Sequence, residues 1–310
     1  MPRPFHRAAV ALGNFDGVHL GHQALFDRLK ALGSRLGGDT VVYTFDPHPV
    51  AFFFPERPPF LLTTIEQRLE LIERFGIPTA VVATFDASYA AQSPEGFVEE
   101  VLVGALSARA VVVGYDFTFG KGRAGTPEVL VSLGRRHGFE VDVIAPVSVD
   151  GEPVSSSRIR RLVAAGRVEE AATLLGRPYA IRGTVVRGHR RGGAALGFPT
   201  ANLATENPVL PANGVYAALV HAVGPDALPG GARPAAVNVG VAPTFAGPGA
   251  RTVEAHLLDF DGDLYGRRLE VAFVARLRDE QRFPDLDALR ARIAADVAAV
   301  RAMLGEAPGR

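Results

Sequence analysis

The chain contains no cysteine among its 310 residues. Without a thiol it can form no disulfide bond, cysteine nucleophile, zinc–thiolate site or iron–sulfur cluster. Lysine is scarce, because only Lys30 and Lys121 are present and arginine carries nearly all the positive charge. An excess of either charge is absent too, since 33 basic residues balance 33 acidic ones. This balance argues against nucleic acid as the main partner, although a local cluster of cations can still bind a small anion.

Long hydrophobic runs are also lacking. No uncharged apolar segment approaches the roughly 20 residues that a membrane-spanning helix needs. Residues 1–12 include Arg3 and Arg7, but their apolar stretch ends at Gly13 and no cleavage-like site follows. We therefore expect a cytoplasmic protein with no signal peptide and no membrane partner. A content of 47% hydrophobic and 21% charged residues is typical of a folded chain, and the length predicts about two domains.

The first half of the chain alternates short apolar runs with helical patterns. The runs that indicate strands are 8–15, 40–45, 79–85, 108–114 and 140–146. The helical patterns are 20–32, 65–75, 94–106 and 127–137, with a helical pair at 157–165 and 168–175. Consecutive apolar residues, as in Val111, Val112 and Val113, indicate strands that are buried on both faces. This order predicts an α/β domain: a Rossmann-like parallel sheet with helices on both faces, whose ligand binds at the carboxyl ends of the strands.

The pattern changes near Gly176, and we place a domain boundary there, giving domains 1–178 and 179–310. Short runs rich in valine and alanine follow at 180–186, 215–222, 235–241, 252–260 and 268–275. Only residues 286–304 then have helical spacing. The second half therefore predicts an antiparallel β-barrel closed off by a C-terminal helix.

A glycine-rich turn joins the first strand to the first helix. Glycine lets the backbone approach a ligand closely, and the amide groups at a helix start favour an anion. His19 and His22 follow, three residues apart and so on one face of the first helical turn. A structural role or a metal site is the alternative for these two histidines. A strand–turn–helix with three glycines favours phosphate binding instead. The predicted phosphate-binding turn comprises Gly13, Asn14, Phe15, Asp16 and Gly17.

A serine run begins the helix predicted near residue 157. Ser155 and Ser156 offer hydroxyl groups at the helix start, and Arg160 adds a positive charge on the same helix. Hydroxyl, amide and guanidinium groups together suit a polyphosphate. An ordinary helix cap with solvated arginines is the alternative interpretation.

Two further loops lie at predicted strand ends. Phe45 and His48 belong to the stiff loop Phe-Asp-Pro-His-Pro after the second strand, which by itself could be purely structural. Asp116 follows the fourth strand in a loop punctuated by glycines. This carboxylate could bind a ligand or cap a turn. All of these motifs fall where an open α/β sheet binds its ligand.

The N-terminal motifs resemble the His-x-Gly-His signature of the nucleotidyltransferase superfamily. In their longer form they are similar to the FAD synthetase module of the bacterial bifunctional riboflavin kinase/FAD synthetases. The resemblance implies that the phosphate of FMN attacks the α-phosphorus of ATP, releasing pyrophosphate and forming FAD. It implies that His19 and His22 stabilise charge in the transition state and that Ser156 and Arg160 hold the departing pyrophosphate. The residues that it assigns to flavin or nucleotide contact are Phe45, His48 and Asp116.

In the second half, a segment rich in glycine and arginine precedes Phe-Pro-Thr-Ala-Asn at 198–202. The segment is either a solvated hairpin loop or a phosphate-binding flap that includes Gly188 and Gly193. Thr200 and Asn202 lie two residues apart, so they offer neutral oxygens on one side of an extended chain. Such oxygens suit Mg²⁺ that is bound together with nucleotide phosphates.

The segment 198–202 resembles the Pro-Thr-Ala-Asn motif of the riboflavin kinase fold, a six-stranded type of antiparallel barrel. Further landmarks of that family follow at 211–217, 238–245, 253–260 and 277–283. The resemblance implies that Thr200 and Asn202 hold Mg²⁺ and nucleotide. It implies that Glu254 is the base for the 5′-hydroxyl of riboflavin. Without the resemblance, Glu254 could be an outward-facing strand residue.

The resemblance extends from Gly13 to the C-terminal helix. It implies an enzyme that converts riboflavin to FMN and FMN to FAD with ATP as co-substrate, and it leaves the oligomeric state open. Ala194 stands where many relatives carry a basic residue, which Arg190 or Arg191 could replace. Two alternatives remain: only one module is active, or the chain is a flavin carrier or regulator without catalysis. A carrier would need neither the histidine pair nor the pair of neutral oxygens.

Overall fold

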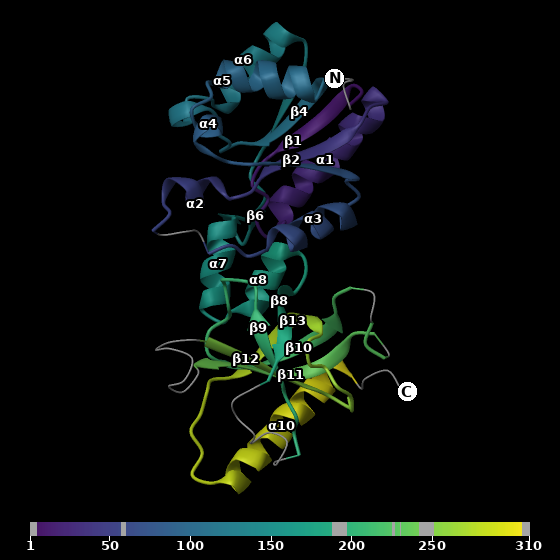
Figure 1. Ribbon diagram of the computed structural model, residues 1–310, viewed down its shortest axis with the longest axis vertical. Coiled ribbons are helices and arrows are strands. Elements are labelled where there is room, and N and C mark those ends of the chain that lie inside the picture. The colour runs from purple at the N-terminus through teal and green to yellow at the C-terminus, as the bar shows by residue number, and fades with distance from the viewer. Residues whose placement is uncertain are drawn as a thin grey trace. The chain divides into compact units, whose positions relative to one another are not determined.

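The computed structural model describes residues 5–56, 60–187, 197–224, 227–229, 231–241 and 251–305 (Figure 1). The chain divides into two compact units, Met1–Ser156 and Ser157–Arg310. Each unit has its own sheet and its own core. Within the described ranges, no helix combines the length and the apolar character needed to cross a membrane.

The first unit is built on a five-stranded parallel sheet in the order β3-β2-β1-β4-β5. The strands are β1 (Ala8–Leu12), β2 (Thr40–Phe45), β3 (Thr79–Ala83), β4 (Ala108–Gly114) and β5 (Glu140–Ile144). β1 is central and all of its residues are buried. It ends earlier than its apolar run predicts, because the chain turns after Gly13 and Phe15 has a φ of 52°.

Helices cover both faces of this sheet (Figure 1). On one face, α1 (Leu20–Leu36) and α3 (Ile65–Arg74) share a core with Ala9 and Ala11 of β1. On the other face, α5 (Pro94–Phe97), the π-helix η1 (Val98–Ala105) and α6 (Pro127–His137) share a core with Ala8, Val10 and Leu12. Alternate residues of β1 thus enter opposite cores, which confirms the predicted Rossmann-like fold.

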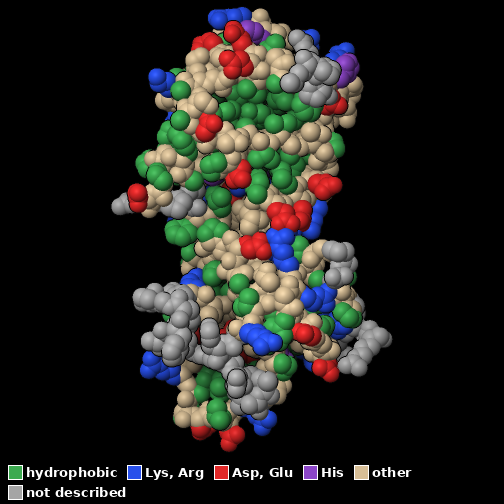
Figure 2. Space-filling view, in the orientation of Figure 1, with side chains coloured by type: hydrophobic (Ala, Val, Ile, Leu, Met, Phe, Trp, Pro, Cys, Tyr) green, Lys and Arg blue, Asp and Glu red, His purple; other side chains and the backbone are tan. Residues whose placement is uncertain are grey.

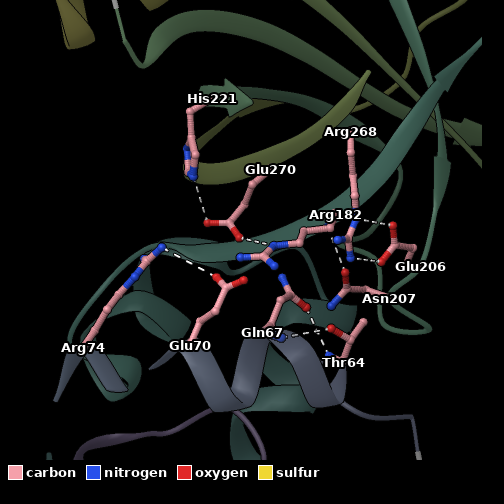
Figure 3. A network of polar contacts seen from close by, with 10 residues as sticks. All are labelled: Thr64, Gln67, Glu70, Arg74, Arg182, Glu206, Asn207, His221, Arg268 and Glu270. Atoms are coloured by element: carbon pink, nitrogen blue, oxygen red, sulfur yellow. Dashed lines mark hydrogen bonds and ion pairs between the residues drawn. The ribbon is translucent and has the colours of Figure 1, made fainter. Parts of the chain in front are cut away.

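The short elements of the first unit are those that the sequence did not predict. They are α2 (Pro49–Phe53), α4 (Ala87–Ala90), the 3₁₀ helix η2 (Lys121–Arg123) and the hairpin of β6 (Ser148–Val149) and β7 (Glu152–Pro153). The single helix expected over 94–106 is α5 continued by η1. The start of α3 has a local cause: the Thr64 hydroxyl accepts a hydrogen bond from Gln67 N, and Gln67 Oε1 accepts one from Thr64 N (Figure 3).

The second unit contains a closed antiparallel barrel in the order β10-β11-β12-β9-β8-β13. The strands are β8 (Tyr179–Val186), β9 (Ala201–Thr205), β10 (Gly214–Ala222), β11 (Arg233–Val241), β12 (Arg251–Leu257) and β13 (Arg268–Arg278). The helix α10 (Leu286–Leu304) packs on it through Val300, against Ala217 and Ala236. The predicted barrel and its C-terminal helix are confirmed. The sequence missed only β9 among these strands, because it is short and carries Asn202 and Thr205 rather than an apolar run.

Two helices precede the barrel. They are α7 (Ser156–Ala164) and α8 (Val168–Leu175). α8 packs against β8 and β13, and Glu169 Oε1 accepts a hydrogen bond of 2.8 Å from Arg276 N. The helix pair predicted at 157–165 and 168–175 is therefore present, within one residue at each end.

A buried ion pair ties three barrel strands together (Figure 3). Glu270 on β13 is the register partner of Arg182 on β8 and of His221 on β10. Arg182 Nε donates to Glu270 Oε2 at 2.6 Å, and His221 Nε2 lies 3.3 Å from Oε1. Burial alone would raise the pKa of Glu270, but the hydrogen bonds from His221 and Arg182 outweigh it and lower the pKa to about 2.

Candidate functional sites

The turn after β1 is held by its own side chains and by β2. The ring of Phe15 folds back over Gly13, where an added Cβ would lie 2.9 Å from Phe15 Cζ. Gly13 N donates to Tyr43 O at 3.2 Å, and the Thr44 hydroxyl donates to Asn14 O at 3.2 Å. Any side chain at Gly13 would displace the ring. The glycine is thus explained by packing as well as by ligand approach.

The two histidines lie against each other at the start of α1. Their ring centroids are 3.6 Å apart with an interplanar angle of 19°, and Phe15 meets His22 edge to face at 5.3 Å. A Cβ on Gly21 would lie 3.1 Å from His19 Cε1, so the glycine makes room for the imidazole. His19 precedes the helix without a side-chain capping bond. The structure thus brings both imidazoles together at a helix start, where an anion is favoured.

Asp16 connects this turn to a distant segment. Its side chain is buried, and its carboxylate accepts hydrogen bonds from Leu62 N at 3.0 Å, Thr63 N at 3.1 Å and the Thr63 hydroxyl at 3.0 Å. The Thr63 hydroxyl also accepts a hydrogen bond of 3.2 Å from Gly17 N. These contacts give Asp16 the means to position the turn.

The serine motif reaches the same turn. Ser156 donates a hydrogen bond of 2.9 Å to the backbone oxygen of Asp16. Ser155 is half-buried next to it, and Arg160 lies four residues further along α7, on the same side of the helix as Ser156. Two motifs that are far apart in the sequence therefore meet.

The residues expected to contact flavin or nucleotide lie at the carboxyl ends of β2 and β4, on either side of β1. Phe45 is the last residue of β2, and its ring meets Phe85 at 5.7 Å and Tyr89 at 5.4 Å. Asp116 is exposed just beyond β4. His48 is buried, and its Nδ1 accepts a hydrogen bond of 3.1 Å from Val50 N that caps α2. The crevice beside the central strand is where such sheets bind ligands.

An aromatic cluster surrounds Phe45, and no motif in the sequence marks its other members. Phe52 and Phe53 of α2 each meet Phe85, at 5.6 and 5.7 Å. Phe53 is 56% exposed. Hydrophobic side chains are visible at the surface of the first unit in Figure 2. Spacing alone gave no signal for this cluster, because its rings come from three separate segments.

In the barrel, the register places Glu254 beside two amides. Glu254 on β12 is the direct partner of Asn202 on β9 and of Asn238 on β11. Direct partners have Cβ atoms about 5 Å apart and point to the same face of the sheet. Val253 and Ala255 are buried on the opposite face, while Glu254 is half-buried. The Glu254 carboxylate and the amides of Asn202 and Asn238 thus lie side by side across three neighbouring strands. Asn238 had no predicted role in the sequence, where it was only part of the landmark 238–245.

The segment before β9 is attached to β12 through His256. Its Nδ1 lies 2.8 Å from the carbonyl oxygen of Pro199, and its ring meets Phe198 edge to face at 5.5 Å. Thr200 is exposed between Pro199 and the first residue of β9. In the sequence, His256 was only part of the landmark 253–260, although strand alternation from Glu254 places the two residues on one face. Gly188 and Gly193, which were predicted for the phosphate flap, lie outside the described residues, as do Arg190, Arg191 and Ala194.

Family comparisons divide the chain in the same order as its motifs. The FAD synthetase family matches residues 2–158 and the riboflavin kinase family matches residues 175–304. A bifunctional riboflavin kinase/FMN adenylyltransferase of Pseudomonas fluorescens is 41% identical over 302 residues, covering 97% of this chain and 94% of the relative. The protein of the same name from Escherichia coli (strain K12) is 37% identical with the same coverage.

The fold of the whole chain also has a solved counterpart. A crystal structure described as a macrolide-efflux protein from Streptococcus pneumoniae matches with a TM-score of 0.86 and 30% identity, over 97% of this chain and 95% of that chain. Both enzymatic domains, the FAD synthetase and the riboflavin kinase, are thus present in one ATP-using chain. The chain belongs to the family of bifunctional riboflavin kinase/FMN adenylyltransferases.

Proposed function

We propose that the barrel converts riboflavin and ATP to FMN, and that the parallel-sheet unit converts FMN and ATP to FAD. The observation that carries the proposal is that each half holds its own set of reactive groups. His19 and His22 are stacked at a helix start in one unit, and Glu254 faces Asn202 in the other. Family membership supplies the substrates, and these groups supply the chemistry.

In the kinase reaction, Glu254 accepts the proton of the riboflavin 5′-hydroxyl. The 5′-oxygen bonds to the γ-phosphorus of ATP while the bond from that phosphorus to the bridging oxygen breaks, so FMN and ADP form. The neutral oxygens of Thr200 and Asn202 fit a hard cation shared with phosphates, and they would hold Mg²⁺ there. The metal would neutralise phosphate charge. The phosphate contacts of Gly188 and Gly193 stay predictions.

In the adenylyl transfer, a phosphate oxygen of FMN bonds to the α-phosphorus of ATP and pyrophosphate leaves. The FMN phosphate is largely ionised at neutral pH, so it needs no general base. His19 and His22 donate hydrogen bonds to the charge that develops at the α-phosphoryl group, next to the amides of the Gly13–Gly17 turn. Ser156 and Arg160 hold the pyrophosphate end, while Asp16 supports the turn.

The flavin of this second reaction would lie at the carboxyl ends of β2 and β4. The half-buried rings of Phe45 and Phe85, with the exposed ring of Phe53 against Phe85, offer a stacking surface for an aromatic ring system. Asp116 would hydrogen-bond the ligand, and His48 would shape the site by capping the helix that carries Phe52 and Phe53. The domain limits of 1–178 and 179–310 also remain a prediction.

A time course with purified protein, riboflavin, ATP and Mg²⁺ tests the function. Chromatography of the flavins should show FMN appearing first and FAD following at its expense. FMN alone would point to a single active module, and a second reaction started from FMN would decide this. No product from either flavin, in protein that still binds flavin, would contradict the proposal and favour a carrier.

A further inference from the structure

Two contacts join His256 to the residues that precede β9. The imidazole Nδ1 lies 2.8 Å from the Pro199 carbonyl oxygen, and the Phe198 ring packs edge to face on the same imidazole. His256 is half-buried on β12, two residues beyond Glu254, so both side chains lie on one face of the strand. His256 thus connects the Pro-Thr-Ala-Asn segment to the strand that carries the proposed base.

The hydrogen bond fixes the state of the imidazole. A carbonyl oxygen can only accept, so Nδ1 must carry the hydrogen. Because the peptide unit is planar and trans, the N–H of Thr200 points away from the Pro199 oxygen and hence away from His256. Holding that oxygen therefore sets the plane of the peptide from which Thr200 projects.

Thr200 is then held from both sides. The residues after it pair with β12, Ala201 with Ala255 and Asn202 with Glu254. This strand pairing begins at Ala201 and does not include Pro199. Among the hydrogen bonds of the described residues, the only one that joins Pro199 to β12 is the one with the His256 side chain. Loss of that contact would free one end of the segment while the other stays paired.

We propose that His256 is a positioning residue of the kinase site, which fixes the Pro199–Thr200 peptide so that Thr200 is presented correctly to the nucleotide phosphates and their cation. This inference rests on the proposed kinase function. His256 acts through Pro199 and does not touch the reacting atoms. Its effect should therefore appear in FMN formation and in the dependence of that reaction on Mg²⁺.

Three substitutions separate this hydrogen bond from general packing. The amide nitrogen of His256→Asn can take the place of Nδ1, whereas the longer side chain of His256→Gln brings its amide nearer the position of Nε2. His256→Ala removes the ring and leaves no side-chain donor. We expect the Ala and Gln variants to lose about 10-fold in kcat for FMN formation, the effect of one hydrogen bond, and to need more Mg²⁺ for half-maximal activity. The Asn variant should stay within about 3-fold of the wild type.

Thermal melting and adenylylation of supplied FMN serve as controls on each sample. Wild-type protein that makes no FMN would contradict the proposed function itself. If the wild type makes FMN and all three variants match it, the positioning role is wrong while the kinase stands. An equal loss in the Asn and Gln variants also overturns the role of the hydrogen bond.

A second measurement reads the wild-type protein, and a variant serves only to assign the signal. Nitrogen-15 NMR of the histidine side chains distinguishes the two neutral tautomers, and the signal of His256 is identified by its absence in His256→Asn. The inference requires neutral His256 to carry its hydrogen on Nδ1. A hydrogen on Nε2 would overturn it.

Discussion

Glu254 and Asn202 are direct partners across the antiparallel pair of β12 and β9. The proposed base and a proposed ligand of the nucleotide-bound cation are thereby placed side by side by backbone pairing rather than by a loop. Asn238 on β11 flanks Glu254 on its other side. Groups on paired strands keep their spacing, which suits a site in which positioning supplies much of the catalysis.

Glu254→Gln keeps the size of the side chain but removes the basic carboxylate. We expect FMN formation to fall by about 10²–10⁴-fold, the usual contribution of a general base. Adenylylation of supplied FMN should be unchanged, because Glu254 takes no part in the proposed adenylyl transfer. Initial rates of both reactions measure the effect. Glu206→Gln, which changes a carboxylate that follows β9 in the same unit and pairs with Arg268, is the control. Unchanged FMN formation in folded Glu254→Gln would remove Glu254 from the reaction.

His22→Ala should have the opposite effect to Glu254→Gln, with FAD formation lost and FMN formation retained. Removing a group that stabilises charge in the transition state costs about 10²–10³-fold in rate, so FAD formation should collapse while FMN accumulates. His6→Ala alters an exposed histidine of the same unit and should leave both rates unchanged. Parallel loss of both activities in a folded His22→Ala protein would contradict the assignment of two sites.

Gly21→Ala should change stability and activity in different directions. Alanine favours a helix over glycine by about 1 kcal/mol, so the melting temperature should hold or rise. The new Cβ would lie 3.1 Å from His19 Cε1 and push the imidazole aside, lowering FAD formation by about 10-fold or more. Ser34→Ala on the exposed face of α1 is the matched control. Full FAD synthesis by Gly21→Ala would show that the placement of the His19 ring is not critical.

The stability of the barrel at acid pH should depend partly on Glu270. Its pKa is about 2 in the folded protein against an ordinary value of 4.5, so its contribution to stability is present above pH 4.5 and is lost as the pH falls toward 2. The contribution amounts to about 3 kcal/mol. Urea unfolding of wild type and Glu270→Gln should therefore differ most near neutral pH and converge in acid. A difference that does not change with pH would contradict the lowered pKa.

Local patterns in the sequence predicted much of the fold. Consecutive valines at 111–113 indicated a strand with two covered faces, and such a strand is found in β4. Features that depend on distant contacts gave no local signal. The strand β9 is polar and exists through its pairing with β8 and β12. The turn at Asp16 is held by Thr63, which lies 47 residues away.

The same distinction applies to the two sites. Spacing predicted that His19 and His22 would share a helix face, and the structure shows them stacked. Spacing could not show that Glu254 faces Asn202, because barrel register is set by pairing along the whole strands. The roles of these residues, as opposed to their positions, await the measurements above.

The most direct test of two sites in one chain combines the two inactivated variants. Neither His22→Ala nor Glu254→Gln alone should convert riboflavin to FAD, because each lacks one step. When the two proteins are mixed with riboflavin, ATP and Mg²⁺, the FMN released by the first should be adenylylated by the second, and FAD should appear. A mixture of the two folded proteins that makes no FAD, although wild type does so under the same conditions, would contradict the account.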